Sequence, residues 1–243
     1  MNLVVDVGNT QIKLAVFEKD RLLLDKRILV HDFLKEIDEI KIRFTEIKRG
    51  IVSSVGNLPD NYLHFLQENY QIHILTNNSK IPFKNKYSTP KTLGVDRIAL
   101  VSAAVNKYPQ RNVLIIDAGS CITYDFINEQ KEYLGGAISP GLEMRFKALN
   151  HYTAGLPLLK SEDFEGFIGD STKASMISGI QNGMVYEVEG FIGKYSEKYK
   201  DLTVILTGGD LHFLSKRLKN TIFANPKFIL GGLNQILEYN KHE

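Results

Sequence analysis

The stretch Leu3–Thr10, LVVDVGNT, recurs half a chain later as Leu114–Cys121, LIIDAGSC. Both copies are apolar runs that end in Asp, one further residue, Gly and a short polar residue. An uninterrupted apolar run is typical of a strand buried inside a sheet, and the Gly that follows favours a tight turn. The repeat therefore predicts two related lobes, each with a strand that delivers a carboxylate, Asp6 or Asp117, toward one charged ligand.

The composition is that of an ordinary globular protein. The chain has 243 residues, of which 43% are hydrophobic and 24% charged, with a formal net charge of +2. This charge gives no broad field that would favour nucleic acid. The single cysteine, Cys121, excludes an internal disulfide, and no apolar run reaches the roughly 20 residues that span a bilayer. We expect a cytoplasmic protein that binds neither nucleic acid nor membranes.

Hydrophobic periodicity predicts the same order of elements in both halves. In the first half we expect strands at 2–7, 11–18 and 21–30, a helix at 32–44, a strand at 50–55, a helix at 61–69, a strand at 71–75, a loop at 82–90 and a helix at 94–108. In the second half we expect strands at 112–117, 122–127 and 132–138, helices at 140–150 and 172–199, a strand at 202–206, a helix at 211–218, and an apolar segment at 228–230 that passes through Gly231 and Gly232 into a helix ending at 239.

This order, three strands followed by helix, strand, helix and strand, is similar to the ribonuclease-H-like lobe shared by actin and by sugar and acetate kinases. The similarity implies an α/β protein with two such lobes, the actin-like ATPase fold, each a mixed five-stranded sheet flanked by helices. We expect the lobes to cover residues 1–110 and 111–243. Element order alone does not reveal an activity, because one fold hosts many functions.

The first Asp-x-Gly turn carries groups that suit a phosphate. Gly8 lets the backbone approach a ligand closely, and Asn9 and Thr10 can donate hydrogen bonds. Asp6 can hold a hydrated Mg²⁺, which usually keeps several waters and one or two carboxylates, and Lys13 can neutralise phosphate charge. An ordinary hairpin turn with Asx-type capping explains the same residues about equally well.

Three further glycine turns extend this interpretation. Asp117-Ala118-Gly119-Ser120 gives a second strand-end carboxylate, which is costly to bury without a cation or donors. Thr207-Gly208-Gly209-Asp210 lies between a predicted strand and helix, and Gly135–Gly141 precedes another helix. Each could present backbone N–H groups to a ligand, although plain loops remain an alternative. Neither a Walker-type loop nor a Gly-x-Gly-x-x-Gly motif is present in the sequence.

Gly94-Val95-Asp96-Arg97 stands at the start of a predicted helix. Asp96 could simply stabilise the helix N-terminus, with Arg97 in solvent. In the functional interpretation, Asp96 is a general base for a hydroxyl nucleophile and Arg97 binds an anionic substrate.

Four motifs, in this order and spacing, resemble those of the type III pantothenate kinases. They are Asp6-x-Gly8-Asn9-Thr10, Gly94-x-Asp96-Arg97, Asp117-Ala118-Gly119 and Gly135-Gly136-x-Ile138-x-Pro140-Gly141. The resemblance runs from Met1 to about Gly232 and implies a homodimeric enzyme that uses ATP to convert pantothenate to 4'-phosphopantothenate, the first step of coenzyme A biosynthesis.

The resemblance also implies roles for individual residues. Asp96 would accept the proton of the pantothenate hydroxyl, Asp117 would bind the monovalent cation, K⁺ or NH₄⁺, and Asp6 would hold Mg²⁺ through water. The residues implied to bind ATP are Asp6, Val7, Gly8, Asn9, Thr10, Gln11, Ile12, Lys13 and Ser120. Those implied to bind pantothenate are Tyr87, Gly94, Val95, Asp96, Arg97 and, across a homodimer, Thr172.

The sequence departs from the family pattern at one place and leaves two other functions open. Ser120 and Cys121 stand where the family commonly has Thr and Ala; serine keeps the hydroxyl, and cysteine is a small, weakly polar substitute. Another actin-fold enzyme, such as a sugar kinase or a polyphosphate hydrolase, is the first alternative. A non-catalytic regulator or nucleic-acid binder is the second, although the basic segment Lys216–Lys219 is short.

Overall fold

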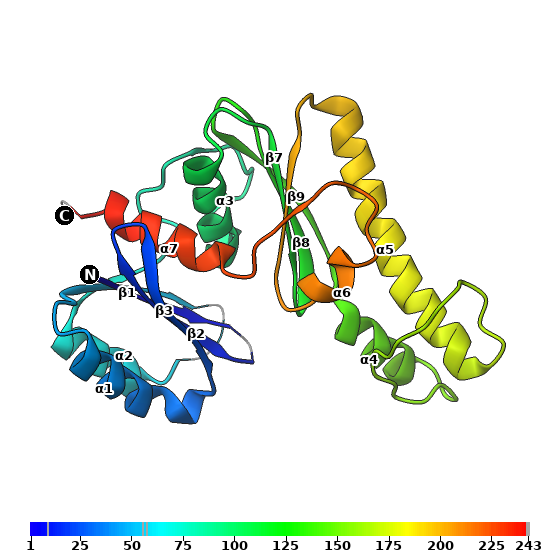
Figure 1. Ribbon diagram of the computed structural model, residues 1–243, viewed down its shortest axis with the longest axis horizontal. Helices are drawn as coiled ribbons and strands as arrows, with labels where there is room; N and C mark the ends of the chain where they lie inside the picture. The colour runs from blue at the N-terminus through cyan, green and yellow to red at the C-terminus, as the bar shows by residue number, and fades with distance from the viewer. Residues whose placement is uncertain (9, 55, 57, 242–243) are drawn as a thin grey trace. The chain divides into compact units, whose positions relative to one another are not determined.

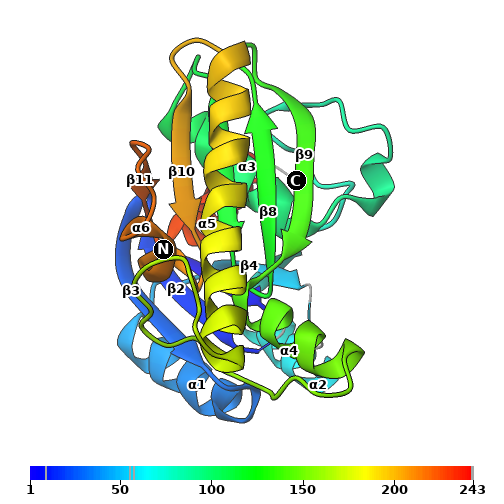
Figure 2. The same cartoon turned by 90° about the vertical axis from the view of Figure 1, so that its right-hand side faces the viewer.

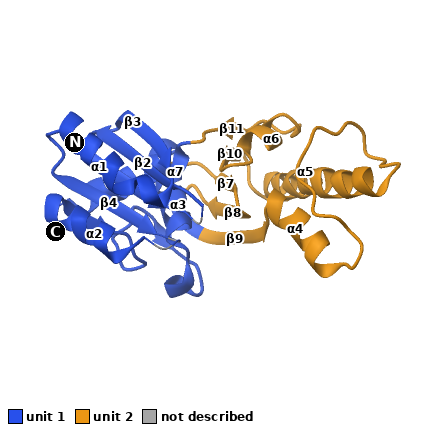
Figure 3. Ribbon diagram, turned by 90° about the horizontal axis from the view of Figure 1, so that it is seen from below, with its two compact units in different colours: residues 1–109, 131–133, 227–243 blue, residues 110–130, 134–226 orange. Residues whose placement is uncertain are grey.

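The computed structural model of the chain describes residues 1–8, 10–54, 56 and 58–241. These residues form two compact units, drawn in two colours in Figure 3. Unit 1 comprises residues 1–109, 131–133 and 227–243, and unit 2 comprises residues 110–130 and 134–226. The chain therefore crosses between the units four times.

Unit 1 is built on a five-stranded mixed sheet with the order β3-β2-β1-β4-β5. The three strands at the start of the chain are antiparallel neighbours, whereas β4 and β5 run parallel to β1. All six residues of β1 are buried, as the uninterrupted apolar run predicted. The strands are β1 (Asn2–Val7), β2 (Ile12–Glu18), β3 (Arg21–Ile28), β4 (Arg49–Ser54) and β5 (Gln71–Ile74).

Helices cover both faces of this sheet (Figure 1). Leu3, Val5 and Val7 share a core with residues of α1 (Phe33–Arg43) and α2 (Asp60–Asn69). On the other face, the Asn2 side chain donates to Asn234 of α7 (Phe228–Tyr239) at 2.8 Å, and α7 packs along α3 (Val95–Lys107). Successive side chains of a strand point to opposite faces of the sheet, so Leu3, Val5 and Val7 contact one set of helices and Asn2 contacts the other.

The last helix corrects two expectations. Gly231 and Gly232 do not precede a helix but lie inside α7, and α7 belongs to unit 1, whereas the division at residue 110 placed it in the second lobe. A Cβ atom on Gly232 would stand 1.9 Å from the carbonyl oxygen of Ala99 in α3. Glycine is therefore required there because the two helix backbones touch.

Unit 2 repeats the strand order of unit 1. In the sheet order β11-β10-β7-β8-β9-β6, strands β7, β8, β9, β10 and β11 occupy the places of β1 to β5. The predicted repeat is thus confirmed. The same sheet has a sixth strand, β6, which pairs with the first residues of β9, and these paired residues belong to unit 1. The strands are β6 (Lys84–Asn85), β7 (Val113–Ala118), β8 (Cys121–Ile127), β9 (Glu132–Pro140), β10 (Thr203–Thr207) and β11 (Phe223–Ala224).

The long helix α5 (Thr172–Lys198) lies along one face of the unit 2 sheet (Figure 2). Its buried side chains share a core with β7, β8 and β10, and with α4 (Leu142–Tyr152) and α6 (Leu211–Ser215). Ring stacking reinforces this contact, since Tyr124 and Phe191 have centroids 4.1 Å apart. No described helix is long and apolar enough to cross a membrane.

The glycine-rich segment before α4 differs from the expected helix start. Gly135 and Gly136 lie within β9, and Pro140 ends that strand instead of opening the helix. Gly136 lets β9 run against the backbone of Tyr124 in β8. Gly141 is the N-cap residue of α4, and its N–H donates to the carbonyl oxygen of Ser120 at 3.1 Å. Because this hydrogen bond ties Gly141 to the Ser120 turn, the backbone stays extended through Pro140 and α4 begins only at Leu142.

Smaller differences concern element ends and short elements. The predicted helix at 211–218 ends at Ser215, and the predicted strand at 21–30 ends at Ile28. Within the predicted loop at 82–90 lies the two-residue strand β6. The two 3₁₀ turns, η1 (Val30–Asp32) and η2 (Pro90–Thr92), and the strand β11 carry no hydrophobic period, which is why pattern reading misses them.

Candidate active site

The turn between β1 and β2 is closed by a backbone hydrogen bond. The N–H of Gly8 donates to the carbonyl oxygen of Gln11 at 3.1 Å. The side chains of Val7 and Ile12 are buried in the core, so these two residues can offer a ligand only their backbone, whereas Thr10 and Gln11 are exposed. Asn9 lies outside the described residues.

Asp6 and Lys13 form an ion pair across the two strands of this hairpin. They stand directly opposite each other in the antiparallel register, and the Lys13 Nζ is 2.9 Å from the Asp6 Oδ2. The Asp6 side chain is only 5% exposed. A buried carboxylate needs a cation, and Lys13 supplies that positive charge at the place where the sequence predicts metal and phosphate.

Asp96 lies in the first turn of α3, two residues after the N-cap residue Gly94. Its Oδ1 accepts a hydrogen bond from the N–H of Arg97 at 2.9 Å. A Cβ atom on Gly94 would stand 2.4 Å from that same oxygen, so glycine leaves the space that the carboxylate occupies. Asp96 therefore does stabilise the helix N-terminus, and this role is compatible with proton transfer.

The surroundings of Asp96 make its carboxylate more basic than usual. Burial raises the pKa of Asp96 above its ordinary value of 3.8, and the negative charge of Asp6 raises it further, while the Arg97 N–H and charge oppose this shift. A carboxylate whose pKa is raised toward neutrality is a better proton acceptor. The structure thus places a base within the electrostatic reach of the Asp6 turn, in the same unit.

Arg97 is not solvated but buried against two neighbouring tyrosine rings. Its Cζ lies 5.5 Å from the ring centroid of Tyr87 and 6.0 Å from that of Tyr133, and only 5% of Arg97 is exposed. The two rings are themselves 6.0 Å apart. Such cation–π contacts fix the planar guanidinium. Val95 is half-buried beside it, at the first position of α3.

Tyr133 is a site residue that sequence reasoning missed. It is fully buried near the start of β9, and its carbonyl oxygen accepts a hydrogen bond from the N–H of Lys86, next to Tyr87. Phe83 packs edge-on against the Tyr133 ring. The sequence marks Tyr133 only as a strand residue, because pairing between β6 and β9 brings it to Arg97 over a long sequence distance.

In unit 2 the second Asp-x-Gly turn has the same plan. The N–H of Gly119 donates to the carbonyl oxygen of Cys121 at 2.9 Å, and Asp117 pairs in register with Thr123 of β8 and Thr207 of β10. Ser120 lies in this turn, and Cys121 begins β8 as a free cysteine.

The Thr207–Asp210 turn packs directly on this second turn. Gly208 has φ +98°, and a Cβ atom there would stand 2.5 Å from the Asp117 Oδ1. The N–H of Asp210 donates to the carbonyl oxygen of Ala118 at 2.9 Å. Burial raises the pKa of Asp210 although its carboxylate accepts a hydrogen bond from the N–H of Leu142 at the start of α4. Asp210 is a second residue whose tie to the turn the sequence did not reveal.

Thr172 stands apart from these turns. It is the exposed first residue of α5, whose N-cap Ser171 accepts a hydrogen bond from the N–H of Ala174 at 3.3 Å. The structure therefore brings together Asp117 and Ser120 in unit 2, and Asp6, Lys13, Asp96, Arg97 and Tyr87 in unit 1.

The residues at both turns fit hydrated or loosely held cations better than a tight protein-bound metal. In the described part of the chain, no group of three or more His, Cys, Asp or Glu side chains could hold a metal ion. Mg²⁺ bound to a nucleotide needs only one or two carboxylates beside phosphates and waters, which matches Asp6. At Asp117, the Gly208 backbone lies so close that only glycine fits beside the carboxylate, which stays at the strand end where a cation with oxygen ligands could reach it.

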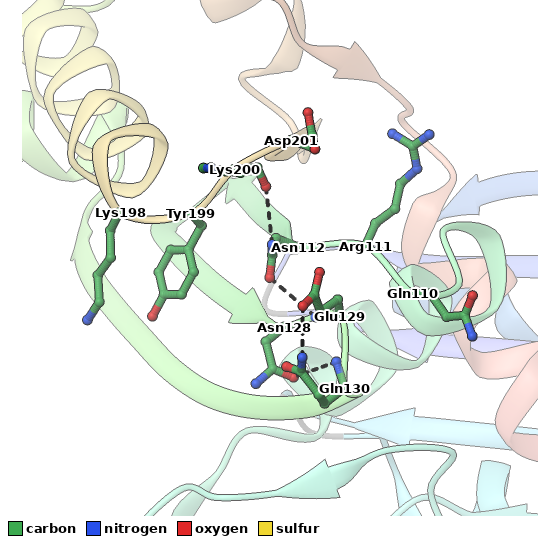
Figure 4. Close-up of a pocket in the computed structure, with 10 residues that line it drawn as sticks. All are labelled: Gln110, Arg111, Asn112, Asn128, Glu129, Gln130, Lys198, Tyr199, Lys200 and Asp201. Carbon is green, nitrogen blue, oxygen red and sulfur yellow. Dashed lines mark hydrogen bonds between the residues drawn. The ribbon is translucent and has the colours of Figure 1, made fainter.

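A separate cavity of about 780 Å³ lies at the other end of the unit 2 sheet, where β7 and β10 begin (Figure 4). Figure 4 shows that Arg111 and Lys198 extend in different directions, so their charges do not converge on one ligand. The carboxylate of Glu129 is held by the Gln130 amide at 2.8 Å. The lining residues are Gln110, Arg111, Asn112, Asn128, Glu129, Gln130, Lys198, Tyr199, Lys200 and Asp201. The candidate functional residues are therefore those at the turn of each unit, and not those of this cavity.

These features suit phosphoryl transfer. That reaction needs little covalent chemistry from the protein and depends on positioning and charge neutralisation. Strand-end carboxylates, glycine turns and a partly buried carboxylate at a helix start are groups of the kind that this reaction uses.

Comparison with known proteins gives a consistent result. Residues 2–194 match the family model described as type III pantothenate kinase. The chain is 54% identical to a type III pantothenate kinase of Christiangramia forsetii, covering 99% of both chains. It is 47% identical to a protein of the same name from Flavobacterium johnsoniae, covering 98% of both.

Solved structures support the fold. A Baf family protein from Campylobacter jejuni superimposes with a TM-score of 0.63 at 22% identity, covering 99% of this chain and 100% of that one. An activator of 2-hydroxyisocaproyl-CoA dehydratase from Clostridium difficile, with bound ADPNP, gives 0.57 at 12% identity, covering 98% and 93%. A glucokinase from an Antarctic psychrotroph gives 0.52 at 11%, covering 98% of each. The predicted two-lobed α/β fold of the actin-like ATPases and sugar kinases is confirmed.

Proposed function

Because this chain belongs to the type III pantothenate kinase family, it phosphorylates pantothenate with ATP for coenzyme A biosynthesis, and we propose that Asp96 is the general base of this reaction. The observation that carries the proposal is the partly buried Asp96 carboxylate in the first turn of α3, which accepts the Arg97 N–H and whose pKa burial raises. Asp96 would accept the proton of the pantothenate hydroxyl as the oxygen attacks the terminal phosphorus of ATP.

We assign the ATP phosphates to residues 6–13 and to Ser120. Support comes from the Gly8 turn that closes the hairpin and from the Lys13 ammonium at Asp6. Asp6 would hold Mg²⁺ through water, and the metal would neutralise charge on the phosphates. Lys13 would then contact phosphate while the metal takes over the pairing of Asp6.

We assign pantothenate to Tyr87, Gly94, Val95, Asp96 and Arg97, with Thr172 contributed by the second subunit of a homodimer. Arg97 has a guanidinium held against two tyrosine rings, which suits recognition of an anionic substrate. Asp117 would bind K⁺ or NH₄⁺ beside Ser120; support comes from its carboxylate at the end of β7, against which the Gly208 turn packs.

A homodimer is supported by α5. A Cβ atom on Gly179, Gly183, Gly190 or Gly193 would meet no atom within 4 Å, and Tyr186 on the same helix is 61% exposed. This open face leaves room for a second chain, and sedimentation equilibrium should give twice the mass of one chain. A monomer at micromolar concentration would reject the dimer. We propose a cytoplasmic location, which the single cysteine supports.

The purified chain should release ADP from Mg·ATP only when pantothenate is present. We expect a coupled ADP assay to show turnover with pantothenate and none above background with a panel of hexoses. Turnover independent of any acceptor would instead indicate a phosphatase, and turnover with a hexose would indicate a sugar kinase.

Two changes to that assay test the cation assignments. Replacing K⁺ by Na⁺ should lower the rate of the wild type, because Na⁺ prefers a smaller ligand shell. An Asp117→Asn variant should be slow in both salts and lose this difference. If Asp117→Asn keeps the full response to K⁺, Asp117 does not hold the monovalent cation.

A further inference from the structure

A hydrogen-bonded ion pair in unit 2 joins α4 to α5. The Arg145 Nη2 lies 2.6 Å from the Glu187 Oε2, and the Glu187 Oε1 accepts a hydrogen bond from the Tyr124 hydroxyl at 2.9 Å. The Tyr124 side chain is fully buried, while Arg145 and Glu187 are 19% and 25% exposed. The two charged side chains and the buried phenol therefore form one hydrogen-bonded cluster.

The electrostatics of Glu187 show that the cluster is well satisfied. Burial alone would raise the pKa of Glu187, but hydrogen bonds from Arg145, Ser139 and Tyr124 outweigh it and lower the pKa below its ordinary value. The carboxylate therefore remains charged and holds the guanidinium in a fixed orientation.

The other atoms of Arg145 hold the segment that ends β9. The Arg145 Nε donates to the carbonyl oxygen of Pro140 at 2.9 Å, and the Nη2 donates to the Ser139 hydroxyl at 2.9 Å. The next residue, Gly141, donates its N–H to the carbonyl oxygen of Ser120 at 3.1 Å. One side chain therefore fixes the strand end that carries the hydrogen bond to the Ser120 turn.

The contact between this strand end and the turn is close. A Cβ atom on Gly141 would stand 2.0 Å from the carbonyl oxygen of Gly119 and 2.7 Å from that of Ser120. A small displacement of residues 139–141 must therefore move the turn. This is also the segment of the Gly135–Gly141 motif for which the proposed mechanism gives no role.

We propose that Arg145 and Glu187 are positioning residues that hold the Gly119–Ser120 turn in its nucleotide-binding shape through residues 139–141. This proposal rests on the assignment of Ser120 to ATP. Arg145 does not touch the reacting atoms; it acts through the backbone of Pro140 and Gly141.

The test compares Arg145→Lys and Glu187→Gln with a matched control on the same helix. Lysine keeps the charge but cannot donate to Pro140, Ser139 and Glu187 together. Losing charge-assisted hydrogen bonds of this kind should weaken ADP binding, measured by calorimetry, about tenfold, with a similar rise in the KM for ATP. The KM for pantothenate should not change. The control is Lys147→Met, which breaks the exposed Lys147–Glu143 pair and should alter neither constant.

A third variant separates a loss of ADP binding from a loss of folding. Ser139→Ala removes one hydroxyl contact of Arg145 and should weaken ADP binding about two- to fivefold without unfolding the chain. Variants that lower the melting temperature but bind ADP as tightly as the wild type would overturn the proposal and leave the pair a purely structural link. If the wild type phosphorylates pantothenate and the variants bind nucleotide as tightly as it does, only this proposal is refuted. A wild type that binds no ADP refutes the ATP assignment as well.

Discussion

Replacing Asp96 by asparagine will lower the rate of pantothenate phosphorylation by about 10²- to 10⁴-fold, the range expected when a general base is removed. Asparagine keeps the size of the side chain and an oxygen that can accept the Arg97 N–H, but it cannot take a proton. ADP affinity should stay close to that of the wild type. Steady-state kinetics and calorimetry on the same preparation measure both quantities.

The expected loss is not a loss of folding. Because burial raises the pKa of Asp96 in the folded state, its charge destabilises the fold at pH values above that raised pKa. A neutral asparagine removes this cost, so the melting temperature at neutral pH should be unchanged or higher. Asp60→Asn is the matched control, since Asp60 is an exposed aspartate in the first turn of α2. The Asp60 charge interacts with its helix dipole in the same way, and the Asp60→Asn variant should keep full activity.

The pH profile gives an independent measure of the same group. Protonated Asp96 cannot act as a base, so kcat/KM should fall as the pH decreases through its pKa. Burial, and secondarily the Asp6 charge, place that midpoint above the ordinary value of 3.8. An Asp96→Asn variant with normal turnover, or one that retains the same acid limb, would show that another group accepts the proton.

The adjacent glycines of α7 should respond to alanine in opposite directions. Gly232→Ala places a Cβ atom 1.9 Å from the Ala99 carbonyl oxygen of α3, and the helix backbone there cannot move aside cheaply. Overpacking of this kind costs about 1–3 kcal/mol, which exceeds the roughly 1 kcal/mol that alanine gains over glycine in a helix. The added Cβ atom in Gly231→Ala would meet no atom within 4 Å, so this variant should keep the stability that alanine gains over glycine in a helix.

Urea unfolding of the two variants beside the wild type gives the comparison. We expect the free energy of unfolding to fall by up to about 2 kcal/mol for Gly232→Ala and to rise by up to about 1 kcal/mol for Gly231→Ala. Activity should also fall in Gly232→Ala, because α3 carries Asp96 one turn before Ala99. If both variants gain stability, the close contact between α3 and α7 does not exist in solution.

The repeat and its turns could be predicted because their signals are local. An apolar run followed by Asp-x-Gly specifies a buried strand and a tight turn within eight residues, and both copies fold this way, with the same strand order around them. The predicted position of Asp96 at a helix start was likewise readable from Gly94–Arg97. Such short patterns depend on backbone sterics and period, which any fold must obey.

The surroundings of those residues could not be read in the same way. The Tyr133 ring reaches Arg97 through pairing of β6 with β9, and the Arg145–Glu187 pair joins helices that are far apart in sequence. Gly231 and Gly232 resemble a helix break in sequence, yet one of them is the contact between α7 and α3. Glycine serves turns and close helix packing alike, so only the neighbour across the contact distinguishes the two.

The sequence by itself determined the duplicated α/β plan, the two Asp-x-Gly turns and the residues that resemble those of a pantothenate kinase. Only the tertiary structure decided that α7 belongs with α3, that Arg97 is held against two tyrosine rings, and that burial raises the pKa of Asp96. The physical reason is the range of the interactions. Strand and turn formation depend on neighbours a few residues away, whereas burial, charge and close packing depend on contacts that exist only after the chain has folded.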